Sequence, residues 1–482
     1  MAQFDQDHAR RRALGAWYTP HELVDELVAA TLDTGWLAGR RGPITVLDPA
    51  CGDGRFLLAA GAWLDAMGVT AEFHGVDIDP QAVALARTSL PTATIVEADA
   101  LTRPWAGVTF DVVLGNPPFL SPLVADSGVA PGRRETVGGP YADAAADFLL
   151  ASVEAVTPDG GRVGLVLPQS LLAARDAAPV RARVDALATI RWSRTTDEHD
   201  FGASVSTCIV LAERPGSGDV DATRASWGQI AADGRGVPPM PALDADGVLG
   251  DRVRATVGFR DEFYSLAAAA GDDVDGPPLV TSGMIDPARC WWGAHPARVA
   301  KRSLAQPRVD LQALEPRMQR WVAERAVPKV LVANQTAVIE AVADPHGEFV
   351  PAVPVIAVLP DHAGERAPVL DVGVWDVAAV LTSPIAAQWA WQQHGGTGMS
   401  ARVVRLSPTL IESMPWPVGS LAPAVGALRA GDVQACGAAV VDAFGAGGST
   451  EGAAGLSWWS AACARVAQRA ARRPTTTVAD PH

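Results

Sequence analysis

The chain has 482 residues, of which 48% are apolar and 19% charged, and this globular composition provides material for two or three domains. A formal charge of −15 excludes a surface that attracts nucleic acid as a whole, so such binding would need a local basic patch. The five cysteines are isolated and lack histidine partners at zinc spacing, and no segment has the roughly 18 consecutive apolar residues of a membrane span. We therefore expect no metal site, no disulfide framework, no signal peptide and no membrane contact, as in a protein of the reducing cytoplasm.

The first predicted element is an amphipathic helix over residues 21–37, preceded by Trp17-Tyr18-Thr19-Pro20. Leucine and valine recur in this helix at helical spacing, and Thr19 or Pro20 can serve as its start signal. An ordinary role for Tyr18 is a core position beside the helix start.

A predicted buried strand over residues 44–47 leads into Asp48-Pro49-Ala50-Cys51-Gly52-Asp53-Gly54 and then into a helix over residues 55–67. Strand, glycine turn and helix form the first half of a Rossmann-like unit, in which backbone amides at the helix start face a ligand. The turn matches neither the dinucleotide nor the nucleoside triphosphate pattern, and Asp48 and Asp53 would repel phosphates. It suits a cationic ligand without phosphate, such as S-adenosylmethionine, although a glycine turn often serves only tight packing.

Acidic residues end the next two predicted strands. Asp77 follows a strand that begins at residue 73, where a carboxylate can accept hydrogen bonds from both hydroxyls of a ribose. Asp79 stands next to Pro80 and is expected only to cap the following helix. Asp99 ends the third strand, over residues 93–96, and could bond an adenine amino group.

The fourth predicted strand, residues 110–114, leads into Gly115-Asn116-Pro117-Pro118-Phe119. The two prolines make a stiff turn that can aim the Asn116 side chain and the Pro117 carbonyl at one point, and these two acceptors suit an exocyclic –NH2 group. Phe119 offers a flat face for stacking. The plainer alternative is a proline-rich strand exit beside a core phenylalanine. Polar groups at four successive strand ends share one edge of the sheet, where ligands bind in open α/β folds.

The rest of the first domain completes this sheet. Residues 122–140 are predicted to be a mobile loop, and residues 143–156 a helix. A fifth strand is predicted over residues 162–168, and a helix over residues 170–187 that a proline breaks. Two late strands without a helix between them, at residues 190–192 and 208–211, predict an antiparallel hairpin at the sheet edge.

The motifs Trp17–Pro20, Asp48–Gly54, Asp77, Asp99 and Asn116–Phe119 resemble, in this order, class I S-adenosylmethionine-dependent DNA adenine-N6 methyltransferases of the gamma arrangement. The resemblance covers residues 14–215 and implies a Rossmann-like, mostly parallel sheet with an antiparallel hairpin at one edge. It places the catalytic group at Asn116, Pro117, Pro118 and Phe119. It places cofactor contacts at Tyr18, Thr19, Pro20, Asp48, Pro49, Ala50, Cys51, Gly52, Gly54, Asp77, Ile78, Asp99, Ala100, Asn116 and Pro118. Phe201 stands where a second aromatic residue packs on the flipped base, and Asp53 replaces the small residue of many members.

Three further segments follow the predicted catalytic domain of residues 1–215. Residues 216–250 are expected to be a linker, residues 251–420 a mixed α+β domain similar to the target-recognition domains of the same group, and residues 421–482 an extension without assigned function. Between residues 289 and 329, nine basic residues against three acidic ones give a charge of +6, with three tryptophans interleaved. We expect phosphate contacts from Arg317, Arg320, Arg325 and Lys329, although a solvated helix face could account for about half of the run.

The resemblance implies methyl transfer to N6 of an adenine flipped out of duplex DNA, in the modification component of a restriction-modification or phage-defence system with a separate endonuclease or defence subunit. Other methyltransferases use the same turn, namely protein-glutamine, RNA and cytosine-N4 enzymes, and a catalytically inactive DNA-binding subunit is a further alternative. The second domain weighs against the protein and RNA enzymes. Asn116 in place of serine favours adenine, and the intact motif set argues against an inactive subunit.

Overall fold

The computed structural model describes residues 19–101, 108–119, 144–172, 174–195, 207–215, 227–360, 372–395 and 402–472. The chain divides into unit 1, residues 1–234, and unit 2, residues 235–482. Each unit is described by itself. No helix among these residues is long and apolar enough to cross a membrane.

Unit 1 is built on a seven-stranded sheet in the order β3-β2-β1-β4-β5-β7-β6. The strands are β1 (Ile44–Asp48), β2 (Ala71–Asp77), β3 (Thr94–Glu97), β4 (Val112–Gly115), β5 (Arg162–Pro168), β6 (Thr189–Thr195) and β7 (Thr207–Glu213). The first five strands in chain order pair in parallel, whereas β7 runs antiparallel to both of its neighbours. The predicted Rossmann-like, mostly parallel sheet with an antiparallel hairpin at one edge is confirmed.

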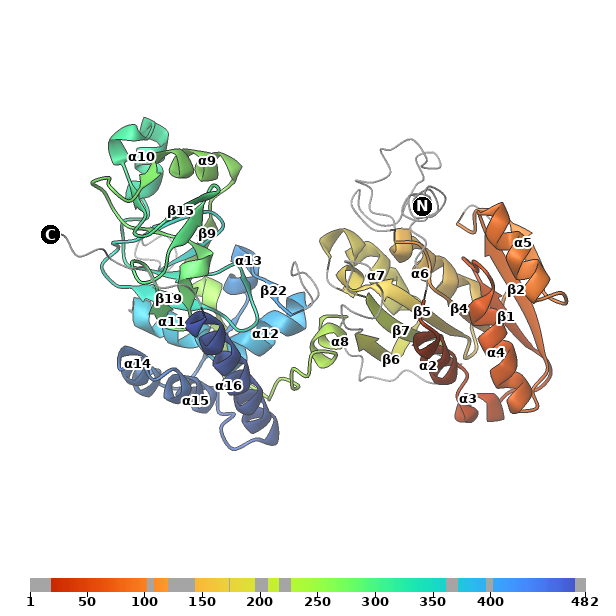
Figure 1. Ribbon diagram of the computed structural model, residues 1–482. Coiled ribbons are helices and arrows are strands. Elements are labelled where there is room, and N and C mark those ends of the chain that lie inside the picture. The colour runs from red at the N-terminus through yellow and green to blue at the C-terminus, as the bar shows by residue number, and fades with distance from the viewer. Residues whose placement is uncertain are drawn as a thin grey trace. The chain divides into compact units, whose positions relative to one another are not determined.

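Helices cover both faces of this sheet (Figure 1), because successive strand residues point to opposite sides. Val46 and Val112 pack with α2 (His21–Thr31), α4 (Arg55–Ala66) and α5 (Pro80–Ser89) in one core. Their neighbours Leu47 and Val113 pack with α6 (Ala144–Ala155), α7 (Ala178–Leu187) and α8 (Trp227–Asp233) in the other. Two buried layers therefore hold the strand ends in fixed positions.

Two helices of unit 1 differ from the sequence prediction. The expected helix over residues 21–37 is divided into α2 and α3 (Thr34–Ala38), because the Asp33 side chain accepts from the amides of Gly35 and Trp36 and starts a new helix. The expected helix over residues 170–187 begins as two 3₁₀ turns, and only α7 is α-helical, with Pro179 in its first turn.

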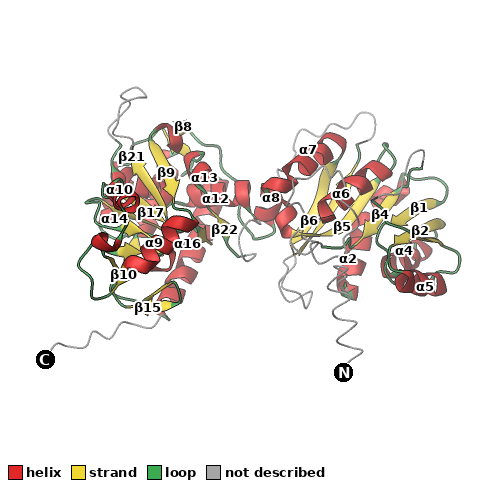
Figure 2. Cartoon of the chain, turned by 90° about the horizontal axis from the view of Figure 1, so that it is seen from above, coloured by secondary structure: helices red, strands yellow, loops and turns green. Residues whose placement is uncertain are grey.

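Unit 2 is a mixed α+β structure around an antiparallel four-stranded sheet in the order β19-β17-β21-β9 (Figure 2). These strands are β9 (Val253–Val257), β17 (Lys329–Val332), β19 (Ala341–Asp344) and β21 (Ile356–Pro360). Shorter strands pair two by two, including the hairpin of β14 (Ala297–Val299) and β15 (Arg302–Leu304). The helices are α9 (Arg260–Ala269), α10 (Pro316–Ala323), α11 (Val374–Leu381), α12 (Pro384–His394), α13 (Pro408–Glu412), α14 (Ala422–Arg429), α15 (Val433–Ala443) and α16 (Thr450–Ala471).

The domain boundaries expected from sequence need correction. Within the presumed linker of residues 216–250, α8 lies in the core of unit 1, and β8 (Ala245–Val248) pairs with β23 (Pro415–Pro417) in unit 2. The presumed extension after residue 420 belongs to unit 2, because Trp459 and Val466 of α16 are buried with Ala387 of α12. Composition misled the prediction, since alanine and glycine here allow close helix packing: a Cβ at Gly437 would lie 2.5 Å from the Trp459 ring.

Lys329 of β17 lies in the interior of unit 2, contrary to its predicted role as a phosphate contact. Its side chain is 0% exposed, and its Nζ donates to Asp344 Oδ2 at 2.5 Å. Burial lowers the pKa of Lys329, and Asp344 opposes that shift. Lys329 is therefore not available to a phosphate, and its removal would leave Asp344 as an uncompensated buried charge.

We expect Lys329→Met to lower the free energy of unfolding of unit 2 by about 3–5 kcal/mol, because it leaves Asp344 buried without its counter-ion. Arg320→Met, at an exposed position of α10, is the control and should change stability by less than about 0.5 kcal/mol. Urea unfolding of the three proteins measures both effects. Equal midpoints for Lys329→Met and the wild type would contradict this account.

Candidate active site at the carboxyl ends of β1 to β4

The parallel register of β1 to β4 brings the predicted site residues to one edge of the sheet. Asp48, the last residue of β1, pairs with Gly75 of β2, and Asp77 at the end of β2 pairs with Glu97 of β3. Gly115 ends β4 on the other side of β1. Three strand ends and the turns after them therefore meet around the start of α4.

Glycine is required where the backbone turns or approaches closely at this edge. Gly52 and Gly54 have φ values of 55° and 87°, in the left-handed region that side chains disfavour. A Cβ at Gly54 would also lie 2.9 Å from Leu90 Cδ1, and a Cβ at Gly115 would lie 2.6 Å from Asp48 Oδ1. The glycines thus permit the tight turn into α4 and the contact of β4 with Asp48.

Asp48 is buried, with 1% of its surface exposed. Its Oδ1 accepts from the amide of Ala50 at 3.0 Å, and its Oδ2 has no hydrogen-bond partner among the described residues. Burial raises the pKa of Asp48 to about 8, and the negative charges of Asp77 and Asp53 add to this effect. The carboxyl is therefore largely neutral at pH 7, and its Oδ2 is left without a hydrogen bond to the described residues.

Asp77 braces the glycine turn against the end of β2. Its Oδ2 accepts from the amide of Gly52 and its Oδ1 from the amide of Asp79, both at 2.8 Å. Burial raises the pKa of Asp77 above its usual value. Asp79 caps α5 by accepting from the Gln81 amide, as predicted. Ile78, between the two aspartates, is 53% exposed.

Further residues expected to contact the cofactor lie after β3 and in the turn after β1. Asp99 follows β3 and accepts from the Leu101 amide at 3.0 Å, next to the buried Ala100. Cys51 is buried and donates its amide to Val76, so it holds the turn to β2. Pro49 and Ala50 complete this turn. Tyr18, Phe201 and the predicted loop of residues 122–140 lie outside the described residues.

Asn116 follows β4 and contacts the segment before α2. Its Nδ2 donates to Thr19 Oγ1 at 2.9 Å, and its Oδ1 is buried without a partner among the described residues. Thr19 is 2% exposed, and Pro20 precedes the first turn of α2. Pro117 is buried, Pro118 is half-buried, and Phe119 packs against both cores of unit 1. Asn116 and Thr19, which are 97 positions apart in the sequence, thus form one site in which the Asn116 oxygen is an acceptor without a partner among the described residues.

The sequence prediction did not include Arg55. This arginine donates from Nη1 to the carbonyl oxygen of Thr19 at 2.7 Å and binds both carboxylate oxygens of Asp53. The signal was present in the sequence, because an arginine in the first turn of a helix is disfavoured by the helix dipole and needs a compensating contact. Asp53 is consequently engaged by Arg55, and does not offer the turn an uncompensated negative charge.

The basic stretch of unit 2 divides into buried and exposed groups. Arg325 has a side chain only 11% exposed, stacks at 3.9 Å on Trp321 and donates to the Trp321 carbonyl, so like Lys329 it is not presented to a phosphate. Arg317 is exposed but paired with Glu262. Arg320 is exposed, as are Arg298 and Lys301 in and beside the β14–β15 hairpin, and no ion pair within the described ranges holds these three.

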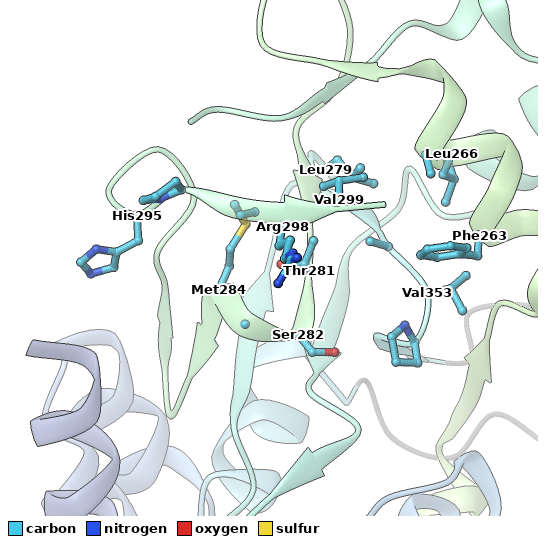
Figure 3. Close-up of a pocket in the computed structure, with 16 residues that line it drawn as sticks. Phe263, Leu266, Leu279, Thr281, Ser282, Met284, His295, Arg298, Val299 and Val353 are labelled. Atoms are coloured by element: carbon cyan, nitrogen blue, oxygen red, sulfur yellow. The ribbon is translucent and has the colours of Figure 1, made fainter. Parts of the chain in front are cut away.

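Arg298 also lines a cavity of about 390 Å³ in unit 2 (Figure 3). Phe263 and Leu266 of α9, Met284 and Val353 give this cavity mainly apolar walls, and further lining comes from Leu279, Thr281, Ser282, His295 and Val299. This cavity therefore adjoins one exposed basic residue, Arg298.

The raised pKa of Asp48 gives a testable pH dependence. The folded protein holds this proton up to about pH 8, whereas the unfolded chain releases it near pH 3.8, so folding stability falls as pH rises between these values. Asp48→Asn removes this dependence. Its stability relative to the wild type should rise by up to about 1.4 kcal/mol per pH unit between pH 5 and pH 8. Denaturant unfolding at both pH values measures it, and a pH-independent difference would contradict an up-shifted carboxyl.

Comparisons with known proteins agree with this geometry. Residues 1–184 match the model of the N-6 DNA methylase family. The Type II methyltransferase M.XamI of Xanthomonas campestris pv. amaranthicola is 35% identical over 127 residues, 24% of this chain and 22% of that protein. The Type II methyltransferase M.TthHB8I of Thermus thermophilus is 42% identical over 112 residues, 23% of this chain and 22% of that protein. The matches thus span about a fifth of the length of these relatives.

A solved structure with a similar chain is the type I restriction-modification system methyltransferase subunit from Streptococcus thermophilus, at a TM-score of 0.34 and 21% identity, covering 40% of this chain and 44% of that one. The match to the family model lies in unit 1, which also contains Asp48, Asp77 and Asn116. Residues 1–184 of this chain are thus similar to the N-6 DNA methylase family.

Proposed function

We propose that this protein transfers the methyl group of S-adenosylmethionine to N6 of an adenine flipped out of duplex DNA, as the modification component of a restriction-modification or phage-defence system. One observation carries the proposal. The Asn116 amide is anchored through its nitrogen to Thr19, and its buried oxygen has no partner among the described residues. A buried acceptor without a donor costs about 1–3 kcal/mol, so its retention fits a substrate that brings the donor.

The glycine turn fits the cofactor. Asp48 keeps an unpartnered buried oxygen, and Asp77 keeps acceptor capacity beyond its two backbone amides, because each carboxylate oxygen has two lone pairs. We assign the methionine end to the residues from Asp48 to Gly54 with Thr19, the ribose to Asp77, and the adenine to Asp99 with the exposed Ile78. When bound, S-adenosylmethionine supplies an electrophilic methyl group.

The chain's own contribution to the reaction is position and electrostatics. Adenine N6 is a weak nucleophile because its lone pair is delocalised into the ring. Acceptors at Asn116 Oδ1 and the Pro117 carbonyl would draw on its two N–H bonds as the nitrogen becomes tetrahedral, and so favour the transition state over the ground state. The base cannot be reached inside a stacked duplex, so flipping is required, and we assign stacking on the base to Phe119.

The alternatives use the same acceptor pair. Cytosine N4, an RNA base or a glutamine amide also presents –NH2, so the amide site alone does not select among them. The match of residues 1–184 to the N-6 DNA methylase family supports adenine in DNA. An inactive subunit has no need of an unpaired buried acceptor, which therefore argues for catalysis.

The deciding experiment is methylation-sensitive sequencing of DNA from cells that express the wild type or Asn116→Ala. Methyladenine at a defined sequence in DNA from the wild-type cells, and not in DNA from the Asn116→Ala cells, supports the proposal. Methylated cytosine, or methylated RNA or protein in the same cells, instead identifies one of the alternatives.

Asn116→Ala should reduce kcat by a hundredfold or more, or on the order of 3–4 kcal/mol, because the acceptor acts mainly in the transition state. Cofactor affinity, measured by calorimetry, should change far less. The rate measurement is single-turnover transfer of labelled methyl to duplex DNA that contains the sequence found above. Transfer at the wild-type rate would refute the assigned role of Asn116.

For DNA binding, we propose contacts from Arg298, Lys301 and Arg320 in place of the buried Lys329 and Arg325. Changing all three to glutamine should weaken binding to any duplex and flatten the dependence of log K on log salt by about three units. The matched control neutralises three exposed arginines elsewhere in unit 2, namely Arg429, Arg465 and Arg472. Fluorescence anisotropy at several salt concentrations compares the two triple variants, and equal slopes would mean that the first three are a solvated face.

A further inference from the structure

Arg55 connects two parts of unit 1 that are far apart in the sequence. Its guanidinium binds Asp53 through Nε to Oδ1 at 3.0 Å and through Nη2 to Oδ2 at 2.6 Å. Its remaining Nη1 donates to the main-chain oxygen of Thr19 at 2.7 Å. The glycine turn after β1 is therefore tied to the segment before α2 by one side chain.

This arrangement opposes local preferences. Arg55 is the first residue of α4, where the helix dipole disfavours a positive charge, and its side chain is 13% exposed, so water contributes little to its solvation. Asp53 compensates: burial alone would raise the pKa of this carboxyl, but the hydrogen bonds and charge of Arg55 hold it below the usual value. Violations of local rules that are compensated in this way concentrate at functional sites.

Thr19 is hydrogen-bonded to both Arg55 and Asn116. Its main-chain oxygen accepts from Arg55, and its hydroxyl oxygen accepts from Asn116 Nδ2 at 2.9 Å. The final torsion of an asparagine side chain is broad and roughly two-fold, so a half-turn exchanges Oδ1 with Nδ2 at little intrinsic cost. After such a turn, Nδ2 would meet the N–H donors of a substrate amine and repel them. In the structure, the bond to Thr19 engages Nδ2 and so leaves Oδ1 as the acceptor of the site.

We propose that Arg55, clamped by Asp53, is a positioning residue that sets the orientation of the Asn116 amide through Thr19. The inference rests on the proposed function, because it assigns to Arg55 a role in amine methylation. Arg55 does not touch the reacting atoms. It affects the rate because it positions Asn116, whose Oδ1 is the acceptor for the substrate amine.

The test compares Arg55→Met, which keeps the length of the side chain without its hydrogen bonds, with Arg55→Lys, which can keep a donor to Thr19. Arg55→Met should lower the single-turnover rate about tenfold or more, with cofactor and DNA affinities changed less than about threefold, and Arg55→Lys should restore part of the rate. The control is Arg40→Met. Arg40 also joins a carboxylate, Asp111, to main-chain oxygens at Asp159 and Gly160, and should leave the rate unchanged.

A double-mutant cycle distinguishes the proposed positioning role of Arg55 from a merely structural role. If Arg55 acts through the amide, Arg55→Met should add little to the loss already caused by Asn116→Ala. A full further tenfold loss in the Asn116→Ala background would overturn the proposal, as would a wild-type rate for Arg55→Met alone.

A second readout does not depend on activity. Hydrogen exchange of the Asn116 side-chain amide, assigned by its absence from spectra of Asn116→Ala, should be slow in the wild type and at least about tenfold faster in Arg55→Met. Equal exchange overturns the positioning role. If the wild type methylates no DNA but exchange responds as expected, the proposed function fails while the link from Arg55 to Asn116 stands.

Discussion

The candidate site depends on one partly buried hydrogen bond, from Asn116 Nδ2 to Thr19 Oγ1, at the point where β4 ends. The protein thereby uses only one end of the Asn116 amide, and the oxygen at the other end is a buried acceptor without a partner among the described residues. The prolines after Asn116 and the cores on both sides of Phe119 restrict movement of this turn. If a substrate amine becomes more acidic in the transition state, Asn116 Oδ1 is already in place as its acceptor, and no water has to reorganise.

Electrostatics at the sheet edge are arranged by pairing and by neutralisation. Three aspartates converge there, yet Asp53 is bound by Arg55, Asp77 accepts two backbone amides, and Asp48 is held largely protonated by burial. Like charges so close together would otherwise destabilise the turn. The acidic character that the sequence displays is therefore much reduced in the folded protein, and what remains is a set of oriented hydrogen-bonding groups.

In unit 2, the number of basic residues in the sequence is larger than the number that is exposed and unpaired on the surface. Of the basic residues between positions 289 and 329, Lys329 is enclosed with Asp344, Arg325 lies on a tryptophan ring, and Arg317 is paired with Glu262. Such pairing is a matter of which strand and helix lie next to each residue, and a linear sequence does not contain it. The exposed cations gather instead at positions such as Arg298 and Lys301, on a hairpin whose pairing is equally non-local.

By itself, the sequence determined the alternation of strands and helices in unit 1, the glycine turn, and the acidic and amide residues at the strand ends, because these follow from local periodicity and turn chemistry. Tertiary structure alone decided that Thr19 meets Asn116 and that Arg55 holds Thr19, since these partners are 97 and 36 residues apart. It also decided the extent of the two units, in which alanine-rich segments became packed helices. Contacts between distant residues depend on register and packing, which no single segment specifies.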